Sequence, residues 1–197
     1  MRLFMNIAVY GAASSLIDEK YKEAGRELGR KITERGHGLV FGGGANGMMG
    51  AVAEGAYEKG GYILGVVPSF FHEANAEVSF KNCTEYIYTD TMRERKQKME
   101  ESSEAFIISP GGIGTFDEFF EILTLKQLGR HNKPIVIFNI NGFYDDIAKS
   151  LQKMVEQKFI TDDCAELCSV FTDIDEILNY IESYDPKDID LSKVKIR

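Results

Sequence analysis

Residues 105–118 read AFIISPGGIGTFDE, an apolar run that ends in a glycine-rich turn and continues into a segment with helical periodicity. Two further runs, at residues 62–67 (YILGVV) and 134–139 (PIVIFN), are apolar throughout rather than alternating. Such strands are typical of a parallel sheet whose two faces are both covered by helices. We therefore predict a doubly wound α/β fold, Rossmann-like, with a mostly parallel sheet and helices on both faces.

The alternation of strand and helix extends over most of the chain. Strands are predicted at residues 6–11, 38–41, 62–67, 85–89, 105–109, 134–139 and 167–171, and helices at 18–35, 45–59, 91–103, 115–128, 143–158 and 174–184. Residues 69–84 show no clear period and are predicted to form an irregular loop. No repeat or linker interrupts the pattern, so we expect one domain over residues 1–184 and a polar tail over 185–197.

The composition narrows the classes of function. The chain has 197 residues and a formal net charge of −8, which argues against a general nucleic-acid binder because such a protein needs a basic face. No apolar run approaches the roughly 18–20 residues of a membrane span, so no membrane partner is expected. Cys83, Cys164 and Cys168 include no C-x-x-C pair, which predicts free thiols in the cytoplasm rather than disulfides or a zinc site.

Two of the predicted strand-to-helix turns are rich in glycine, at residues 42–50 (GGGANGMMG) and 110–115 (PGGIGT). Glycine allows the backbone to approach a ligand closely, and free N–H groups at a helix N-terminus bind anions. Either loop alone is explained about as well by a tight turn, but two in one sheet indicate a phosphorylated ligand. The first loop matches G-x-G-x-x-G, yet residues 62–67 lack the acid that would hold a ribose, which disfavours a nicotinamide enzyme.

Glu118 follows the second glycine loop and has two interpretations. The spacing Thr115-x-x-Glu118 predicts a capping box, in which Thr115 is the N-cap and Glu118 reaches back to it. Alternatively, a carboxylate about one turn from a phosphate can stabilise a sugar carbon that becomes cationic, as in glycosidic cleavage. The neighbouring Asp117 is interpreted as a favourable charge near the helix N-terminus.

The predicted helix at 91–103 carries a basic pair. Met92, Met99 and Ser103 share a helix face, and either Arg95 or Lys96 falls on or beside it. A cation on a buried face needs a partner, which is either a carboxylate in an ion pair or an anionic ligand in the cleft. No group of histidines or acids has metal-ligand spacing, so no metal is expected.

Together these motifs resemble the cytokinin-activating phosphoribohydrolase (Lonely Guy) family, whose members are often labelled possible lysine decarboxylases. The similarity covers residues 7–181 and rests on GGGxxGMMG at 42–50, MxERK at 92–96, PGGxGTxxE at 110–118 and TLKQLG at 124–129 followed by His131 and Lys133-Pro134. It implies a nucleotide-binding catalytic domain that hydrolyses the N-glycosidic bond of a nucleoside 5′-monophosphate. The products would be a free base and ribose 5-phosphate, and no cofactor would be required.

The resemblance also implies roles for residues by position. Arg95 and Glu118 would be the catalytic pair. The substrate-binding residues would be Glu77, Lys96, Gly112, Ile113, Gly114, Thr115, Phe116, Asp117, Thr124, Gly43 and Gly44. For Glu77, a solvated loop carboxylate is the alternative. The base pocket is expected to include apolar residues of the loop at 70–80.

Two features bear on specificity and assembly. Gly11-Ala12-Ala13-Ser14 stands where the family usually has Gly-Ser-Ser, and Leu125 replaces a common tryptophan, which concerns substrate preference. Members of this short type are commonly homodimers, with contacts expected from Met92 and Met99 or from the helix at 119–128. For the two methionines, a place in the core is the alternative and the more usual role.

Three alternative functions remain at this stage. A non-catalytic nucleotide-binding sensor of the same fold would bind nucleotide without turnover, although the presence of both Arg95 and Glu118 argues against it. An oxidoreductase would bind NAD(H). A structural dimer, in which the glycines only shape turns, would be indifferent to phosphate.

Overall fold

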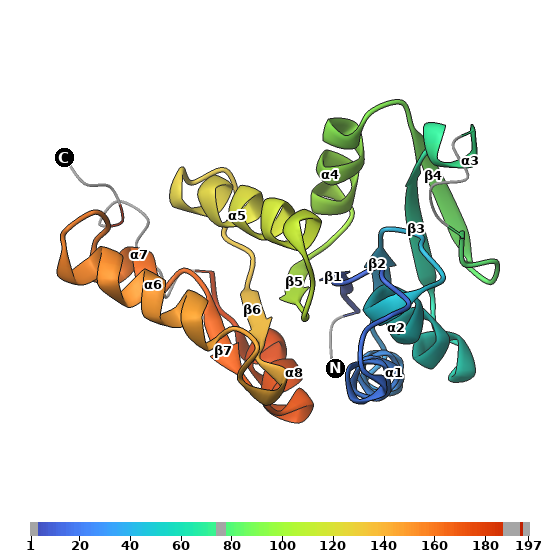
Figure 1. Cartoon of the computed structure of the whole chain (residues 1–197), viewed down its shortest axis with the longest axis horizontal. Helices are drawn as coiled ribbons and strands as arrows, with labels where there is room; N and C mark the ends of the chain where they lie inside the picture. The colour runs from blue at the N-terminus through green and yellow to red at the C-terminus, as the bar shows by residue number, and fades with distance from the viewer. Residues whose placement is uncertain (1–3, 74–77, 187–193, 195–197) are drawn as a thin grey trace.

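Seven strands form one sheet in the order β4-β3-β2-β1-β5-β6-β7, and every pairing is parallel (Figure 1). The computed structural model describes residues 4–73, 78–186 and 194. The strands are β1 (Asn6–Tyr10), β2 (Gly38–Phe41), β3 (Ile63–Pro68), β4 (Glu85–Thr89), β5 (Ala105–Ile108), β6 (Ile135–Phe138) and β7 (Ser169–Phe171). The predicted doubly wound parallel sheet is confirmed.

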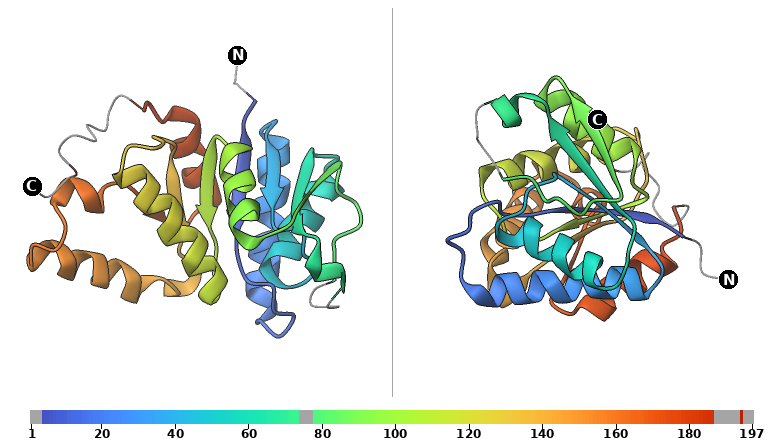
Figure 2. Two further views of the ribbon diagram at one scale, coloured as in Figure 1. Left: turned by 90° about the horizontal axis from the view of Figure 1, so that it is seen from above. Right: turned by 90° about the vertical axis from the view of Figure 1, so that its right-hand side faces the viewer.

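Helices cover both faces of the sheet (Figure 2). They are α1 (Glu19–Glu34), α2 (Gly47–Glu58), α3 (Phe70–Glu73), α4 (Met92–Glu101), α5 (Ile113–Gln127), α6 (Asp145–Glu156), α7 (Asp162–Ala165) and α8 (Ile174–Ser183), with a 3₁₀ turn at Ile140–Gly142. The central strand serves two cores, because Ile7 and Val9 pack with α1, α2 and α8, whereas Ala8 and Tyr10 pack with α4 and α5. This burial on both faces explains why the strands are apolar throughout.

The direction of winding reverses beside β1. The chain runs outward from β1 through β2 and β3 to β4, and it then returns to β5 on the other side of β1. The loops that follow β1 and β5 leave the sheet at this switch point, where open α/β sheets form a crevice at their strand ends. One hydrogen bond joins the two loops, from the Ala12 N–H to the carbonyl of Pro110 at 3.0 Å.

Helix α5 begins two residues earlier than predicted. Gly112 is its N-cap, no side chain caps it, and the Phe116 N–H donates to the Gly112 carbonyl at 3.1 Å. The predicted capping box is therefore wrong: Thr115 is already inside the first turn, and Glu118 lies in the second turn, too far along to reach the N-cap. A capping box occurs instead at the start of α4, between Thr91 and Glu94.

Smaller differences concern short elements. Helix α3 lies in the region predicted as an irregular loop, and α7 precedes a strand β7 that is shorter than predicted.

All three cysteines are free thiols, with Cys164 and Cys168 buried, as predicted. Most of the predicted tail lies outside the described residues, but Val194 is buried against Cys164 and Leu167. Within the described residues, the structure contains no helix of the length and apolarity needed to span a membrane.

Candidate functional site

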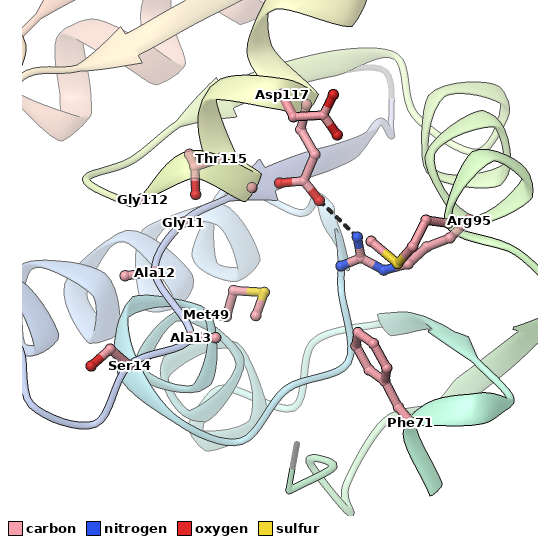
Figure 3. A pocket seen from close by; sticks show the side chains of 13 residues that line it. Gly11, Ala12, Ala13, Ser14, Met49, Phe71, Arg95, Gly112, Thr115 and Asp117 are labelled. Carbon is pink, nitrogen blue, oxygen red and sulfur yellow. Dashed lines mark hydrogen bonds and ion pairs between the residues drawn. The ribbon is translucent and has the colours of Figure 1, made fainter. Parts of the chain in front are cut away.

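A cavity of about 300 Å³ opens at the carboxyl ends of β1 and β5 (Figure 3). Segments far apart in the sequence line it, namely Gly11, Ala12, Ala13 and Ser14 after β1, Met49 of α2, Phe71 of α3, Met92 and Arg95 of α4, and Gly112, Gly114, Thr115, Asp117 and Glu118 at the start of α5. The cavity therefore lies at the switch point of the sheet, the usual ligand position in this fold.

Arg95 and Glu118 form an ion pair in the wall of this cavity. The Arg95 Nη1 donates to Glu118 Oε1 at 2.8 Å, and the two side chains are only 5% and 11% exposed. The Arg95 Nε donates to the carbonyl of Val66, in β3, at 3.1 Å, so two directed bonds fix the guanidinium plane. The helix periodicity left Arg95 and Lys96 as alternatives, and the structure places Arg95 on the buried face.

The environment of Glu118 favours its neutral form more than water does. Burial raises the pKa of the Glu118 carboxyl above its ordinary value, and the charge and hydrogen bond of Arg95 oppose this rise. Tyr10 lies in the core beneath, and burial together with the charge of Glu118 raises the pKa of its phenol well above its ordinary value. A buried carboxyl with a raised pKa, in a cavity and beside a cation, has the properties of a group that accepts or donates a proton.

The first turn of α5 presents backbone donors at the cavity. N–H groups in the first turn of a helix have no acceptor within that helix, and the helix dipole adds partial positive charge there. Gly112 and Gly114 line the cavity, and a Cβ atom at either would meet no atom within 4 Å. Neither residue has a positive φ. These two glycines are thus not required by packing or by backbone conformation, which favours a ligand site over a tight turn.

Hydrogen bonds from buried residues hold the loop that leads into α5. Tyr144, which is fully buried, donates from Oη to the carbonyl of Ser109 at 2.8 Å. The Ser109 hydroxyl in turn donates to the carbonyl of Tyr10 at 2.7 Å. Asn139 accepts the Tyr144 N–H at 2.7 Å and so fixes the backbone that carries the phenol. These hydrogen bonds fix the position of the turn that leads into α5.

The first glycine loop has a different role. The Gly43 carbonyl accepts the Phe80 N–H at 2.8 Å, and Gly44 forms an isolated antiparallel bridge with Ser79. Gly43 and Gly44 do not line the cavity, so their assignment as substrate-binding residues stays a prediction without geometric support. Met49, which belongs to the last part of this loop and to the first turn of α2, does line the cavity.

Other predicted site residues lie in a neighbouring groove. Lys96, Ile113, Phe116 and Thr124 line this groove along α5, and Asp117 lines both the groove and the cavity. The Lys96 Nζ lies 3.0 Å from Asp117 Oδ2 and 2.5 Å from Glu121 Oε2, so two carboxylates compensate its charge. The side chain of Glu77 falls outside the described residues.

Several lining residues were not assigned from the sequence. Met49 and Met92 contribute to the apolar part of the wall, and the segment Gly11–Ser14 enters the sequence analysis only through its departure from the family pattern. The sequence signal that could have identified this segment as part of the site is its position directly after the first predicted strand. Phe71, by contrast, lies in the predicted loop at 70–80, which was expected to contribute apolar residues to the base pocket. A search of the described residues finds no group of three or more His, Cys, Asp or Glu side chains that could hold a metal ion.

Comparison with known protein sequences gives consistent matches. The model of a family described as possible lysine decarboxylase matches residues 49–181. The cytokinin riboside 5′-monophosphate phosphoribohydrolase LOG2 of Arabidopsis thaliana is 34% identical, over 93% of this chain and 85% of its own. The enzyme of the same name, LOG, of Oryza sativa subsp. japonica is also 34% identical, over 93% of this chain and 75% of its own.

Solved structures with this architecture are more distant in sequence. The Moco carrier protein from Chlamydomonas reinhardtii matches with a TM-score of 0.67 at 23% identity, covering 89% of this chain and 94% of that chain. The molybdenum cofactor binding protein from Rippkaea orientalis matches with a TM-score of 0.67 at 18% identity, covering 93% and 97%. At such identities the likeness shows a shared fold alone.

Proposed function

The chain belongs to the family of the cytokinin riboside 5′-monophosphate phosphoribohydrolases, and on this premise we propose that it hydrolyses the N-glycosidic bond of a nucleoside 5′-monophosphate. The substrates are AMP or its N6-modified derivatives, and the products are a free base, adenine or a cytokinin, and ribose 5-phosphate. One observation carries the proposal: a buried Arg95–Glu118 pair shares a cavity with the free N-terminus of α5.

The 5′-phosphate binds at the first turn of α5. The backbone N–H groups of this turn and the helix dipole attract the anion, and the absent side chains of Gly112 and Gly114 leave the space it occupies. The Thr115 hydroxyl lies in the same wall and adds a donor. Phosphate binding at this end of the helix places the ribose next to the second turn, which carries Glu118.

Glu118 acts on the anomeric carbon of the ribose. Its carboxylate stabilises the positive charge that develops there as the bond to the base breaks. The bonding electrons leave with the base nitrogen, which takes up a proton from solvent, and a water oxygen forms the new bond to the carbon; the proton that this water loses to Glu118 then returns to solvent. Glu118 orients this water and accepts its proton, a role that suits a carboxyl whose pKa is raised by burial.

The apolar wall accommodates the base. Figure 3 shows Phe71 on the Arg95 side of the cavity, away from Gly112, and Met49 and Met92 line the cavity as well. Thioether and aromatic side chains contact a purine face favourably and tolerate different shapes. This wall can therefore contact both plain adenine and a base with an apolar N6 substituent.

Chromatography of reaction mixtures tests the proposal. Purified protein is incubated with AMP and with N6-isopentenyl-AMP, and free base and ribose 5-phosphate are measured. We expect wild-type protein to release both products and Glu118→Gln to lose at least about 100-fold in kcat, since general base and charge stabilisation are both removed. Glu101→Gln is the matched control, because Glu101 is on the exposed face of α4 and pairs with Lys98. Binding of either nucleotide without release of base would instead favour the non-catalytic sensor.

We also propose a cytoplasmic homodimer. Met99 is fully buried and belongs to the core, so it cannot supply a contact, whereas Phe120 on α5 and Leu128 at its C-cap are 39% and 54% exposed. Exposed apolar side chains along one helix suit an interface between subunits. Light scattering after size-exclusion chromatography should give a dimer for wild-type protein and a monomer for Leu128→Glu. Three free thiols fit a reducing compartment.

A further inference from the structure

Gly42, directly after β2, lies against the guanidinium of Arg95. A Cβ atom at Gly42 would be 1.9 Å from Arg95 Nη2 and 3.1 Å from Arg95 Cζ. It would also lie 3.0 Å from the sulfur of Met49. Non-bonded heavy atoms do not approach to 1.9 Å, so any side chain at position 42 must displace the guanidinium.

The guanidinium has little freedom to yield. Its Nε is bonded to the carbonyl of Val66 at 3.1 Å and its Nη1 to Glu118 at 2.8 Å. Arg95 as a whole is 4% exposed, so neighbouring atoms enclose it. Movement away from Gly42 therefore lengthens or breaks the bonds that orient the planar group.

The backbone does not itself require glycine at this position. Gly43, the next residue, has φ +83°, a conformation in which a side chain is strained. Gly42 is not among the residues with positive φ. What excludes a side chain at position 42 is the space taken by Arg95 and, to a smaller extent, by Met49.

We propose that Gly42 is a positioning residue, whose missing side chain leaves the space in which the Arg95 guanidinium reaches Glu118. The catalytic consequence rests on the proposed function, but the spatial relationship does not. The first glycine of the loop at 42–50 therefore serves a side chain of the protein itself, whereas Gly112 and Gly114 leave space for the ligand.

A double-mutant cycle on thermal unfolding tests the spatial relationship without any assay of activity. The proteins are wild type, Gly42→Ala, Arg95→Ala and Gly42→Ala/Arg95→Ala. We expect Gly42→Ala to lower the Tm of the wild-type protein by at least about 4 °C. In the Arg95→Ala background it should change the Tm little, since the guanidinium that it meets is absent. An equal decrease in Tm in the wild-type and Arg95→Ala backgrounds would overturn the proposal.

Kinetics over a range of pH test the consequence for Glu118. When the guanidinium moves away, the buried carboxylate loses its counter-charge and is protonated more readily. We expect Gly42→Ala to lower kcat at neutral pH at least tenfold, to move the acid limb of the profile to higher pH and to change KM less than twofold. The control is Gly25→Ala in α1. Gly25 is also buried, and a Cβ atom there would meet Met48 Sδ at 3.0 Å, far from Arg95 in the sequence. This variant should keep the wild-type dependence of kcat on pH.

The outcomes separate the two proposals. A Gly42→Ala protein with wild-type kcat and acid limb, or with a loss of kcat that is equal at every pH, would overturn the positioning role. If wild-type protein turns over no nucleotide at all, the proposed function fails, and the unfolding cycle still decides whether Gly42 provides the space for Arg95.

Discussion

Arg95 and Glu118 are 23 residues apart in the sequence, and in the folded chain Arg95 Nη1 donates to Glu118 Oε1 at 2.8 Å. Strand β5 and the second glycine loop separate them along the chain. A buried ion pair is a poor means of stabilising a protein, because desolvation of the two charges offsets their attraction. The position of this pair in the cavity wall is better explained by the proposed role in catalysis than by a contribution to stability.

Glu118 should cost the protein stability at neutral pH. An acid whose folded pKa lies above its unfolded pKa loses stability as pH rises through the interval between the two values. Because burial raises the pKa of Glu118, its ionised form carries this cost at neutral pH, and a glutamine does not. We expect Glu118→Gln to melt at a higher temperature than wild type at pH 7, with a difference that shrinks on acidification.

Calorimetry at several pH values checks this prediction. Glu101→Gln again serves as the control, because that side chain is exposed and its substitution should leave the pH dependence of Tm nearly unchanged. A Glu118→Gln protein that is less stable than wild type at pH 7 would contradict the prediction, and would show that Arg95 depends on a full negative charge.

Gly114→Ala should separate binding from folding. The added methyl group meets no protein atom within 4 Å, and alanine is a better helix former than glycine. We expect unchanged or increased stability, by up to about 1 kcal/mol, together with an increase of at least tenfold in KM, because the methyl group occupies space proposed for the phosphate. Urea unfolding and steady-state kinetics measure the two effects. An unchanged KM would place the phosphate elsewhere.

Tyr144→Phe removes the hydroxyl that holds the loop before α5, where we propose that the phosphate binds. The phenol donates to the Ser109 carbonyl at 2.8 Å, and its loss leaves that buried acceptor unpaired. We expect a loss of about 1–2 kcal/mol in the free energy of unfolding. KM should rise several-fold, since the loop before α5 is held less firmly. Phe143→Leu is a suitable control, because Phe143 is partly exposed and lies beside Tyr144 without this bond.

His131 predicts a pH dependence of stability unrelated to catalysis. Burial lowers the pKa of His131 to about 4. Its neutral ring donates from Nε2 to the Ile122 carbonyl at 2.8 Å and accepts the Lys133 N–H at Nδ1, which protonation would prevent. A base with a depressed folded pKa gains stability as pH rises from that value to its unfolded value near 6.5.

The expected gain in the free energy of unfolding for His131 is about 1–2 kcal/mol between pH 4 and pH 6.5, less than the full shift implies because the ring is only partly buried, and it is measured by urea unfolding. His131→Gln should lack this component, and the difference between the two proteins isolates it from the titration of other groups. Parallel pH curves for the two proteins would contradict the assignment.

The class of fold could be predicted from local pattern. Strands buried on both faces, such as β5 and β6, have no polar residue to place on a solvent face, so their uniform apolarity follows from the parallel sheet. The exposed and buried faces of α1 and α8 likewise follow from the helical periodicity of their apolar residues. Boundaries were less certain where glycine permits several conformations, and α5 accordingly begins at Ile113 rather than Thr115.

The site was predicted only as a set of residue types near strand ends. Helix periodicity could place either Arg95 or Lys96 toward the core, because their side chains point only about 100° apart. It was the crossing of α4 over β3, with Val66 as acceptor, that directed Arg95 inward and left Lys96 facing Asp117 and Glu121.

Periodicity, glycine content and spacing act within one or two turns of chain, and they were enough to predict a parallel α/β sheet with glycine-rich turns after two of its strands. Whether Glu118 caps a helix or faces a cavity, and whether Gly42 serves a turn or Arg95, depends on contacts between β2, α4 and α5. Such contacts are set by strand order and helix packing, and therefore only the tertiary structure could decide them.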